Sequence, residues 1–229
     1  AEMYTRMLSA LREGDASPAV AAHVFLGAPG AFSAGNDIED FLNSTREAGR
    51  LSNPVVGFIS HLPVVRKPMI AAVDGLAVGV GTTMLFHCDL VYATPQSSFR
   101  TPFLDLGLVP EAGSSLLAPR LMGHQRAFEL LVLGEPFTAE RALAAGLLNA
   151  ILPPADLEAK ALSAARRLAM KPPKALAAAR ALLRGDPQTV SELIAREVEM
   201  FAELLKSPEA KEAFTAFLEK RPPDFARLR

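Results

Sequence analysis

Two glycine-punctuated turns, each following a short apolar run, constrain the fold of this chain more than any other feature. The first turn spans residues 30–37 and follows the apolar run at residues 23–26. The second spans residues 75–81 and follows the apolar run at residues 68–73. Glycine closes such turns because it adopts backbone conformations that other residues avoid. The pattern therefore predicts buried strands that lead into helices, as in an α/β layer structure.

The remainder of the chain adds two strand candidates and a long helical region. Residues 90–92 and 98–100 are further strand candidates, whereas the chain beyond about Ala112 reads as almost wholly helical. Thr138 is a suitable N-cap, and Ser207 followed by Pro208 begins the final helix. Helices are predicted over residues 1–11, 38–48, 82–87, 139–145, 154–170, 174–184, 189–206 and 208–220.

Composition excludes several classes of function. The 229 residues are 50% hydrophobic, enough for one full domain with a small appended subdomain. Lys and Arg total 24 against 25 Asp and Glu, which argues against nucleic acid as the main partner. The longest uncharged run near the glycine-rich centre, residues 75–88, is too short to span a bilayer. The lone Cys88 excludes an internal disulfide, so we expect a cytoplasmic protein.

Backbone chemistry indicates what the two glycine turns do. A strand-to-helix turn aims unpaired N–H groups at one point, and the helix dipole strengthens their attraction for a developing oxyanion. Taken singly, each turn is equally consistent with an ordinary glycine loop. A dinucleotide-binding fingerprint is excluded for the second turn, because Met84 stands where its third glycine belongs.

The motifs and their order resemble the crotonase (enoyl-CoA hydratase/isomerase) superfamily, and most closely its peroxisomal-type Δ3,Δ2-enoyl-CoA isomerase branch. The matching strings are FSAGNDI at residues 32–38, KPMIAAVDGLAVGVG at 67–81, FRTPFLDLGLVPEAGSS at 99–115, FTAERALAAGLLNAILP at 137–153 and AFTAFLEKRPPDF at 213–225. The resemblance implies an α/β fold with a ββα spiral core over residues 1–153 and a C-terminal helical trimerisation region over residues 154–229. The family normally opens with a strand and an asparagine-rich turn that are absent here. Either the sequence is truncated or the sheet lacks its first strand.

The resemblance also implies a site. The backbone N–H groups of Ala34 and Val80 correspond to the family's oxyanion donors. Asp37 is better suited to fixing its loop than to catalysis. Lys220 is consistent either with a coenzyme A phosphate contact or with a cation favouring a helix C-terminus. Residues implied to bind the acyl-CoA substrate are Phe32, Ser33, Ala34, Asp37, Ile38, Gly79, Val80, Phe103 and Lys220.

Acid–base groups select among the reactions of this scaffold. The positions that hold the two hydratase glutamates carry Thr83 and Phe103 here, and neither side chain replaces a carboxylate. Glu111 matches the single catalytic base of the isomerases. By spacing alone, Glu111 would only favour the start of a helix through its dipole. Apolar neighbours should raise its pKa, whereas a helix N-terminus should lower it.

These features lead to one favoured function and two alternatives. The chain is expected to isomerise 3-enoyl-CoA to 2-enoyl-CoA with Glu111 as the proton shuttle, without metal or redox cofactor. A hydratase-type lyase and a non-catalytic acyl-CoA-binding or interaction domain remain open. The four histidines show no metal-ligand spacing, and Asp105 is expected to be a solvated loop residue. The resemblance implies two partners, an acyl-CoA thioester and further copies of the chain in a homotrimer or hexamer.

Overall fold

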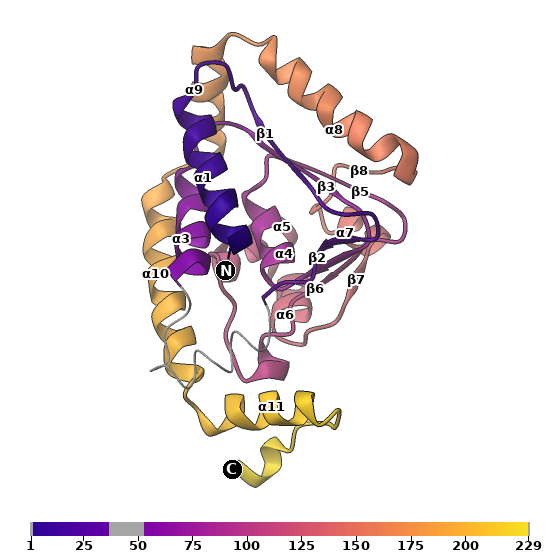
Figure 1. The fold of residues 1–229 in the computed structure, drawn as a ribbon, viewed down its shortest axis with the longest axis vertical. Helices are drawn as coiled ribbons and strands as arrows, with labels where there is room; N and C mark the ends of the chain where they lie inside the picture. Colours follow the sequence, from indigo (N-terminus) through magenta and orange to yellow (C-terminus); the bar gives the residue numbers. More distant parts are fainter. Residues whose placement is uncertain (1, 37–52, 229) are drawn as a thin grey trace.

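The computed structural model describes residues 2–36 and 53–228, and two four-stranded sheets lie at its centre (Figure 1). The first sheet has the order β1 (His23–Leu26), β3 (Met69–Val73), β5 (Leu90–Ala93) and β8 (Ala150–Ile151), and its paired strands are parallel. The second has the order β2 (Ala31–Ser33), β4 (Leu76–Val78), β6 (Ser98–Arg100) and β7 (Phe137–Thr138). Strand β7 pairs antiparallel to β6, whereas the other neighbours are parallel.

Consecutive strands alternate between the two sheets, which makes the core a spiral. Strands β1, β3 and β5 each turn directly into β2, β4 and β6 of the other sheet. Asp74, between β3 and β4, holds three successive corners together. Its carboxylate accepts hydrogen bonds from the N–H of Gly30 at 2.9 Å and the hydroxyl of Thr94 at 2.8 Å. Gly75 is required at this corner, since a Cβ there would lie 1.9 Å from the carbonyl oxygen of Gly30.

Helices surround the spiral (Figure 1). The described helices are α1 (Glu2–Ala16), α3 (Asn53–His61), η1 (Leu62–Val64), α4 (Val80–Thr83), η2 (Met84–His87), η3 (Leu104–Leu106), α5 (Ser114–Met122), α6 (His124–Leu131), α7 (Ala139–Ala144), α8 (Pro154–Ala169), α9 (Pro173–Arg184), α10 (Pro187–Leu204), α11 (Pro208–Leu218) and η4 (Phe225–Leu228). Helix α8 covers the sheet of β1, β3 and β5, and α10 packs against α3 and η1. Helix α11 lies apart from the sheets, where it contacts η3.

The core has two parts, separated by the first sheet. Every residue of β3 is buried, which matches its unbroken apolar sequence. Met69, Ala71 and Val73 point into the main core, whereas Ile70 and Ala72 pack with Leu157 and Ala161 of α8. A C-terminal helix thus completes one face of the spiral sheet. The same buried cluster joins residues before and after residue 153, where the sequence predicts a boundary between two regions. That boundary stays a prediction.

The structure confirms the α/β class and corrects several elements. Strands β2 and β4 lie inside the segments predicted as glycine turns, because pairing between the turns makes them strands. Helix α1 continues past Gly14 and Asp15 to Ala16, and the Asp15 carboxylate accepts hydrogen bonds from the N–H groups of Arg66 and Lys67. Strands β7 and β8 interrupt the region predicted as wholly helical. The helix predicted over residues 38–48 lies outside the described residues.

Other predictions are confirmed almost to the residue. Strands β1, β3, β5 and β6 match the predicted strand segments, and the hydroxyls of Thr138 and Ser207 cap α7 and α11 as expected. The segment predicted as one helix over residues 82–87 begins earlier, as α4, and continues as the 3₁₀ helix η2.

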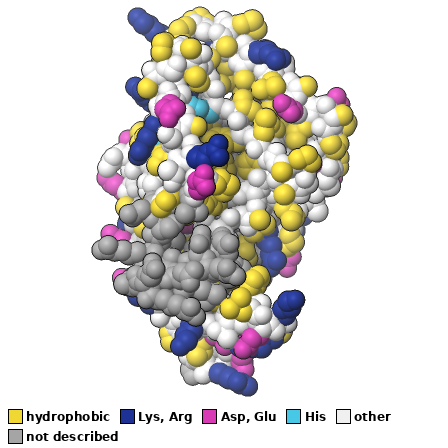
Figure 2. Space-filling view, in the orientation of Figure 1, with side chains coloured by type: hydrophobic (Ala, Val, Ile, Leu, Met, Phe, Trp, Pro, Cys, Tyr) yellow, Lys and Arg dark blue, Asp and Glu magenta, His cyan; other side chains and the backbone are white. Residues whose placement is uncertain are grey.

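Of the described helices, none has the length and apolar character needed to cross a membrane. On the face drawn in Figure 2, basic side chains are scattered and form no patch.

Candidate active site

The start of helix α4 presents backbone N–H groups at a tightly held turn. Gly79 precedes the helix with φ of 55°, a left-handed value that favours glycine, and its N–H donates to the carbonyl of Arg100 at 2.9 Å. Thr82 anchors the first turn by donating from its hydroxyl to the carbonyl of Ala77 at 2.6 Å. Val80 is the first residue of the helix, a position whose N–H has no acceptor within the helix.

The first glycine turn packs directly against this helix start. A Cβ on Gly35 would lie 2.8 Å from the carbonyl oxygen of Val78, and a Cβ on Gly81 would lie 2.7 Å from the Cβ of Ser33. Both glycines are therefore needed for the close approach. Because Ala34 lies between Ser33 and Gly35, the structure brings the segment of Ala34 beside that of Val80. The sequence predicted this meeting only through the resemblance.

A buried carboxyl group, that of Glu111, contacts the C-terminal end of α4. Glu111 is 6% exposed, and its Oε1 accepts a hydrogen bond from the hydroxyl of Thr83. Thr83 follows Val80 by three residues on the same helix face, which corresponds to a rise of about 4.5 Å. The other oxygen of Glu111, Oε2, is buried and has no hydrogen-bond partner among the described residues.

The surroundings of Glu111 favour its protonated form. Burial raises the pKa of Glu111 from 4.5 to about 7, the hydrogen bond from Thr83 opposes this shift, and the negative charge of Glu197 adds to it. The sequence set apolar burial against a helix N-terminus and favoured burial on the basis of the neighbouring apolar residues, and burial does have the larger effect on the pKa of Glu111. The prediction that Glu111 begins a helix is wrong, because α5 starts at Ser114.

Left-handed backbone conformations shape the turn that carries Glu111. Ala112 has φ of 57° and Gly113 has φ of 72°. His87 donates from Nε2 to the carbonyl of Ala112 at 2.6 Å, and the Ser114 hydroxyl donates to the carbonyl of Glu111 at 2.6 Å. The His87 ring is almost fully buried, and this burial lowers its pKa to about 4, so it is a neutral donor here. The contacts hold a strained turn in one conformation.

Two buried side chains that sequence reasoning did not identify support this turn. The spacing of His87 relative to the other histidines indicates no metal site, and Glu197 belongs to none of the family-like motifs. Glu197 shares the buried face of α10 with Val190, Ile194 and Phe201. A carboxylate within an otherwise apolar helical stripe is a signal in the sequence, because such groups are rarely buried without partners.

The other residues predicted to bind the substrate lie partly in the core, partly at the surface and partly outside the described residues. Phe103 is 6% exposed and belongs to the main core, and Phe32 packs against that core. Ser33 accepts a hydrogen bond from the N–H of Gly35 at 3.3 Å. Asp37 and Ile38 lie outside the described residues. Lys220 is exposed after α11, with φ of 53°.

Two further candidates are surface or structural groups. Asp105 is exposed and pairs with Arg100 at 3.0 Å, as expected of a solvated loop residue. Burial raises the pKa of Cys88 to about 12, which makes it an inert thiol. Within residues 2–36 and 53–228, no group of three or more His, Cys, Asp and Glu side chains could hold a metal ion.

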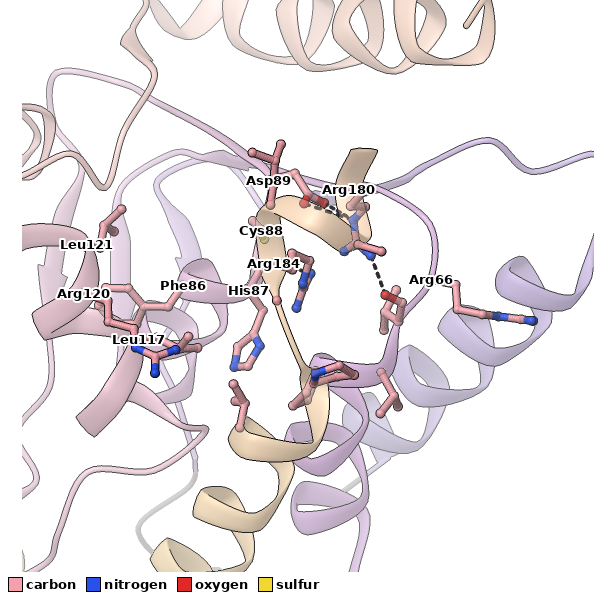
Figure 3. Close-up of a pocket in the computed structure, with 18 of the residues that line it drawn as sticks. Arg66, Phe86, His87, Cys88, Asp89, Leu117, Arg120, Leu121, Arg180 and Arg184 are labelled. Atoms are coloured by element: carbon pink, nitrogen blue, oxygen red, sulfur yellow. Dashed lines mark hydrogen bonds and ion pairs between the residues drawn. The ribbon is translucent and has the colours of Figure 1, made fainter. Parts of the chain in front are cut away.

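A cavity of about 600 Å³ lies between α9, α5 and the η1 and η2 turns (Figure 3). Two of its arginines form hydrogen bonds with the surrounding chain. Arg180 donates to the carboxylate of Asp89 at 2.9 Å and to the carbonyl of Val65 at 2.6 Å, and Arg184 donates to the carbonyl of His87 at 2.9 Å. Through these contacts Arg180 and Arg184 anchor α9 to the spiral. Glu111 does not line this cavity.

Comparison with known proteins places the chain in a family. The family model described as enoyl-CoA hydratase/isomerase matches residues 1–227. A probable enoyl-CoA hydratase of Rhizobium meliloti (strain 1021) is 34% identical over 95% of this chain and 84% of its own length. Enoyl-CoA delta isomerase 2 of Rattus norvegicus is 34% identical over 80% of this chain and 48% of its own length.

A solved structure has the same fold. The crystal structure of an enoyl-CoA hydratase/isomerase from Pseudoalteromonas atlantica T6c superposes with a TM-score of 0.91 at 37% identity, covering 98% of this chain and 89% of that one. The likeness extends through the spiral and the C-terminal helices. This chain therefore belongs to the enoyl-CoA hydratase/isomerase family, and its fold is the crotonase fold.

Proposed function

We propose that this protein moves the double bond of a 3-enoyl-CoA thioester to the 2-position, with Glu111 carrying the proton. One observation carries the proposal. The buried carboxyl group of Glu111 has one oxygen held by a hydrogen bond from Thr83, while its second oxygen has no hydrogen-bond partner among the described residues. A carboxyl group with a pKa of about 7 can both accept and return a proton near neutral pH, as a shuttle requires.

The reaction needs two proton transfers on one carboxyl group. Glu111 takes a proton from C2 of the substrate, and the electron pair of that C–H bond moves into a dienolate whose charge rests on the thioester oxygen. The dienolate then takes the same proton at C4. The double bond thereby moves from C3–C4 to C2–C3, and the carboxylate is regenerated with no net change in atoms or electrons.

The backbone N–H groups of Ala34 and Val80 would hold the dienolate oxygen. Support comes from the close packing of the two turns and from the position of Val80 at a helix start. Phe32, Ser33, Gly79 and Phe103 would line the acyl-CoA site beside them, and Lys220 would meet a phosphate of coenzyme A. The chemistry requires no metal or redox cofactor.

Hydration of a 2-enoyl-CoA is the second candidate, because relatives named as hydratases match this chain as well as those named as isomerases. Against it, Thr83 and Phe103 occupy the positions of the hydratase glutamates, and Phe103 is packed in the core. A non-catalytic acyl-CoA-binding role is the third candidate. The buried carboxyl group of Glu111 argues against it. A buried polar group with an unpartnered oxygen lowers the stability of the folded protein, and acyl-CoA binding alone does not require one.

The decisive experiment supplies the purified protein with a 3-enoyl-CoA and, separately, with a 2-enoyl-CoA. We expect conversion of the first to its 2-enoyl isomer and little or no 3-hydroxyacyl-CoA from the second. Rapid formation of the hydroxyacyl product would instead support hydration. Binding of both thioesters without turnover would support the non-catalytic role.

We also propose that the protein works in the cytoplasm as a trimer or a pair of trimers. Of the apolar residues on α11, Phe214 is buried within the chain, whereas Phe217 and Leu218 are each 56% exposed. Leu182 and Leu183 at the end of α9 are more exposed still. Such side chains gain free energy when a neighbouring copy covers them. Sedimentation at micromolar concentration tests this, and a monomer mass would contradict it.

A further inference from the structure

Helix α10 sends one charged side chain into the turn that carries Glu111. Glu197 is 5% exposed, and both of its oxygens accept hydrogen bonds. Its Oε2 accepts from the N–H of Gly113 at 2.6 Å, and its Oε1 accepts from the hydroxyl of Ser115 at 2.5 Å and the N–H of Ser115 at 3.3 Å. More than eighty residues separate the partners, so the fold alone creates this contact.

Glu197 replaces a cap that the local sequence does not supply. Helix α5 begins after Gly113, which has no side chain to accept from the first N–H groups of the helix. All three partners of Glu197 are donors, so the ionised carboxylate is the form that fits. Its negative charge at a helix N-terminus is also favoured by the helix dipole. Although burial raises the pKa of Glu197, the hydrogen bonds from Ser115 and Gly113 oppose that shift.

The anchored turn is strained, and α10 lies directly against it. Ala112 adopts a left-handed φ of 57°, a conformation that is unfavourable for a residue other than glycine. A Cβ on Gly113 would lie 2.8 Å from Cγ1 of Val190, so the turn has no free space on the side of α10. His87 holds the carbonyl of Ala112 from the other side. Release of either contact would let the turn relax and Glu111 move.

The same side chain acts on Glu111 through its charge. The groups that face Glu111 are the Thr83 hydroxyl from α4 and the Glu197 carboxylate from α10, while neutral His87 reaches it only through Ala112. Thr83 stabilises the ionised form of Glu111, and Glu197 disfavours it. The pKa of Glu111 therefore reflects a balance between two elements of the fold in addition to burial.

We propose that Glu197 is a positioning residue for Glu111, fixing the turn that carries it and keeping a negative charge beside it. The inference rests on the proposed role of Glu111 as the base. Glu197 itself touches no substrate in this role. It acts through Gly113 and Ser115, and through space on the carboxyl group of Glu111.

The test replaces Glu197 by Gln, with Glu199→Gln as the matched control. Both changes remove one carboxylate from α10, but Glu199 is exposed. Gln keeps the length of the side chain, yet its amide N–H₂ would face the donors of Ser115. We expect kcat of Glu197→Gln to fall between about tenfold and 10²-fold, as for a misplaced catalytic group, with KM nearly unchanged. The acid limb of kcat against pH should shift to lower pH. Glu199→Gln should leave both kcat and the limb unchanged.

A second readout requires no turnover. ¹³C-NMR of Glu-labelled protein follows the titration of Glu111, whose signal is assigned by its loss in Glu111→Gln. The titration midpoint of Glu111 should move to lower pH in Glu197→Gln and should be unchanged in Glu199→Gln. If Glu197→Gln does not fold, Ser115→Ala should shift the midpoint in the same direction by a smaller amount, because Glu197 loses a donor that stabilises its charge. An unchanged midpoint in the folded variant overturns the inference. Full isomerase rate in Glu111→Gln instead overturns the proposed role of Glu111 as the base, whatever the NMR result.

Discussion

The hydroxyl of Thr83 donates a hydrogen bond to Oε1 of Glu111, so a residue on α4 determines how the buried carboxyl group is oriented. The contact leaves Oε2 without a hydrogen-bond partner among the described residues. It also joins the helix that begins at Val80 to the turn before α5. Thr83 on α4 thus supports a carboxyl group that belongs to a different part of the fold.

Replacement of Thr83 tests this support. Thr83→Val keeps the shape and removes the donor, so we expect kcat to fall between about tenfold and 10²-fold, the value of a hydrogen bond to a charged group. The acid limb of kcat against pH should move to higher pH, because the hydrogen bond from Thr83 lowers the pKa of Glu111. Thr83→Ser should restore both. If the acid limb of kcat against pH does not move in Thr83→Val, Thr83 only packs against Glu111 and does not support its charge.

Loss of the carboxylate should abolish turnover without loss of binding. Glu111→Gln keeps the shape of the side chain but cannot accept the C2 proton, so we expect kcat for 3-enoyl-CoA to fall by at least about 10²-fold. The dissociation constant for a non-reacting acyl-CoA, measured by calorimetry, should stay nearly the same. Asp105→Asn is the control and should cost little, since Asp105 is exposed and pairs with Arg100. More than about a tenth of the wild-type rate in Glu111→Gln would exclude it as the base.

The raised pKa of Glu111 should appear in the stability of the protein. Between pH 4.5 and about pH 7 the unfolded chain loses this proton while the folded chain keeps it, so stability falls as pH rises through that range. The full effect is roughly 3 kcal/mol for a shift of this size. We expect the difference in free energy of unfolding between Glu111→Gln and wild type to grow in favour of the variant from pH 5 to pH 8. Urea titrations measure this difference. A difference that is constant with pH would contradict the assignment.

His87 should contribute a trend of the opposite sign. Its pKa is about 4 in the folded protein and about 6.5 in the unfolded chain, so the unfolded chain binds a proton first as pH falls. Stability should therefore decrease by up to roughly 3 kcal/mol between pH 6.5 and pH 4. His87→Gln, which can still donate to Ala112, should flatten this decrease in urea titrations. His124→Gln at an exposed position should not.

Much of the architecture could be predicted because local rules dominate there. Strand β3 is buried on both faces and its sequence is continuously apolar. Thr138 and Ser207 cap α7 and α11 through contacts within three residues. By contrast, β2 and β4 contain three residues each and become strands only through pairing in the second sheet, where β4 lies between β2 and β6. Short strands of this kind carry too few residues for periodicity to distinguish them from turns.

The sequence by itself predicted the fold family and the two glycine turns with the segments of Ala34 and Val80, and it singled out Glu111 as the candidate base. Only the tertiary structure decided how that carboxylate is held. Thr83 lies 28 residues before Glu111, and Glu197 lies 84 residues after Gly113, so neither contact leaves a local pattern. The structure also decided that burial outweighs the hydrogen bond from Thr83, because the carboxyl group lies before the helix and inside the core. Desolvation depends on what surrounds a group in space, which the order of residues along the chain does not specify.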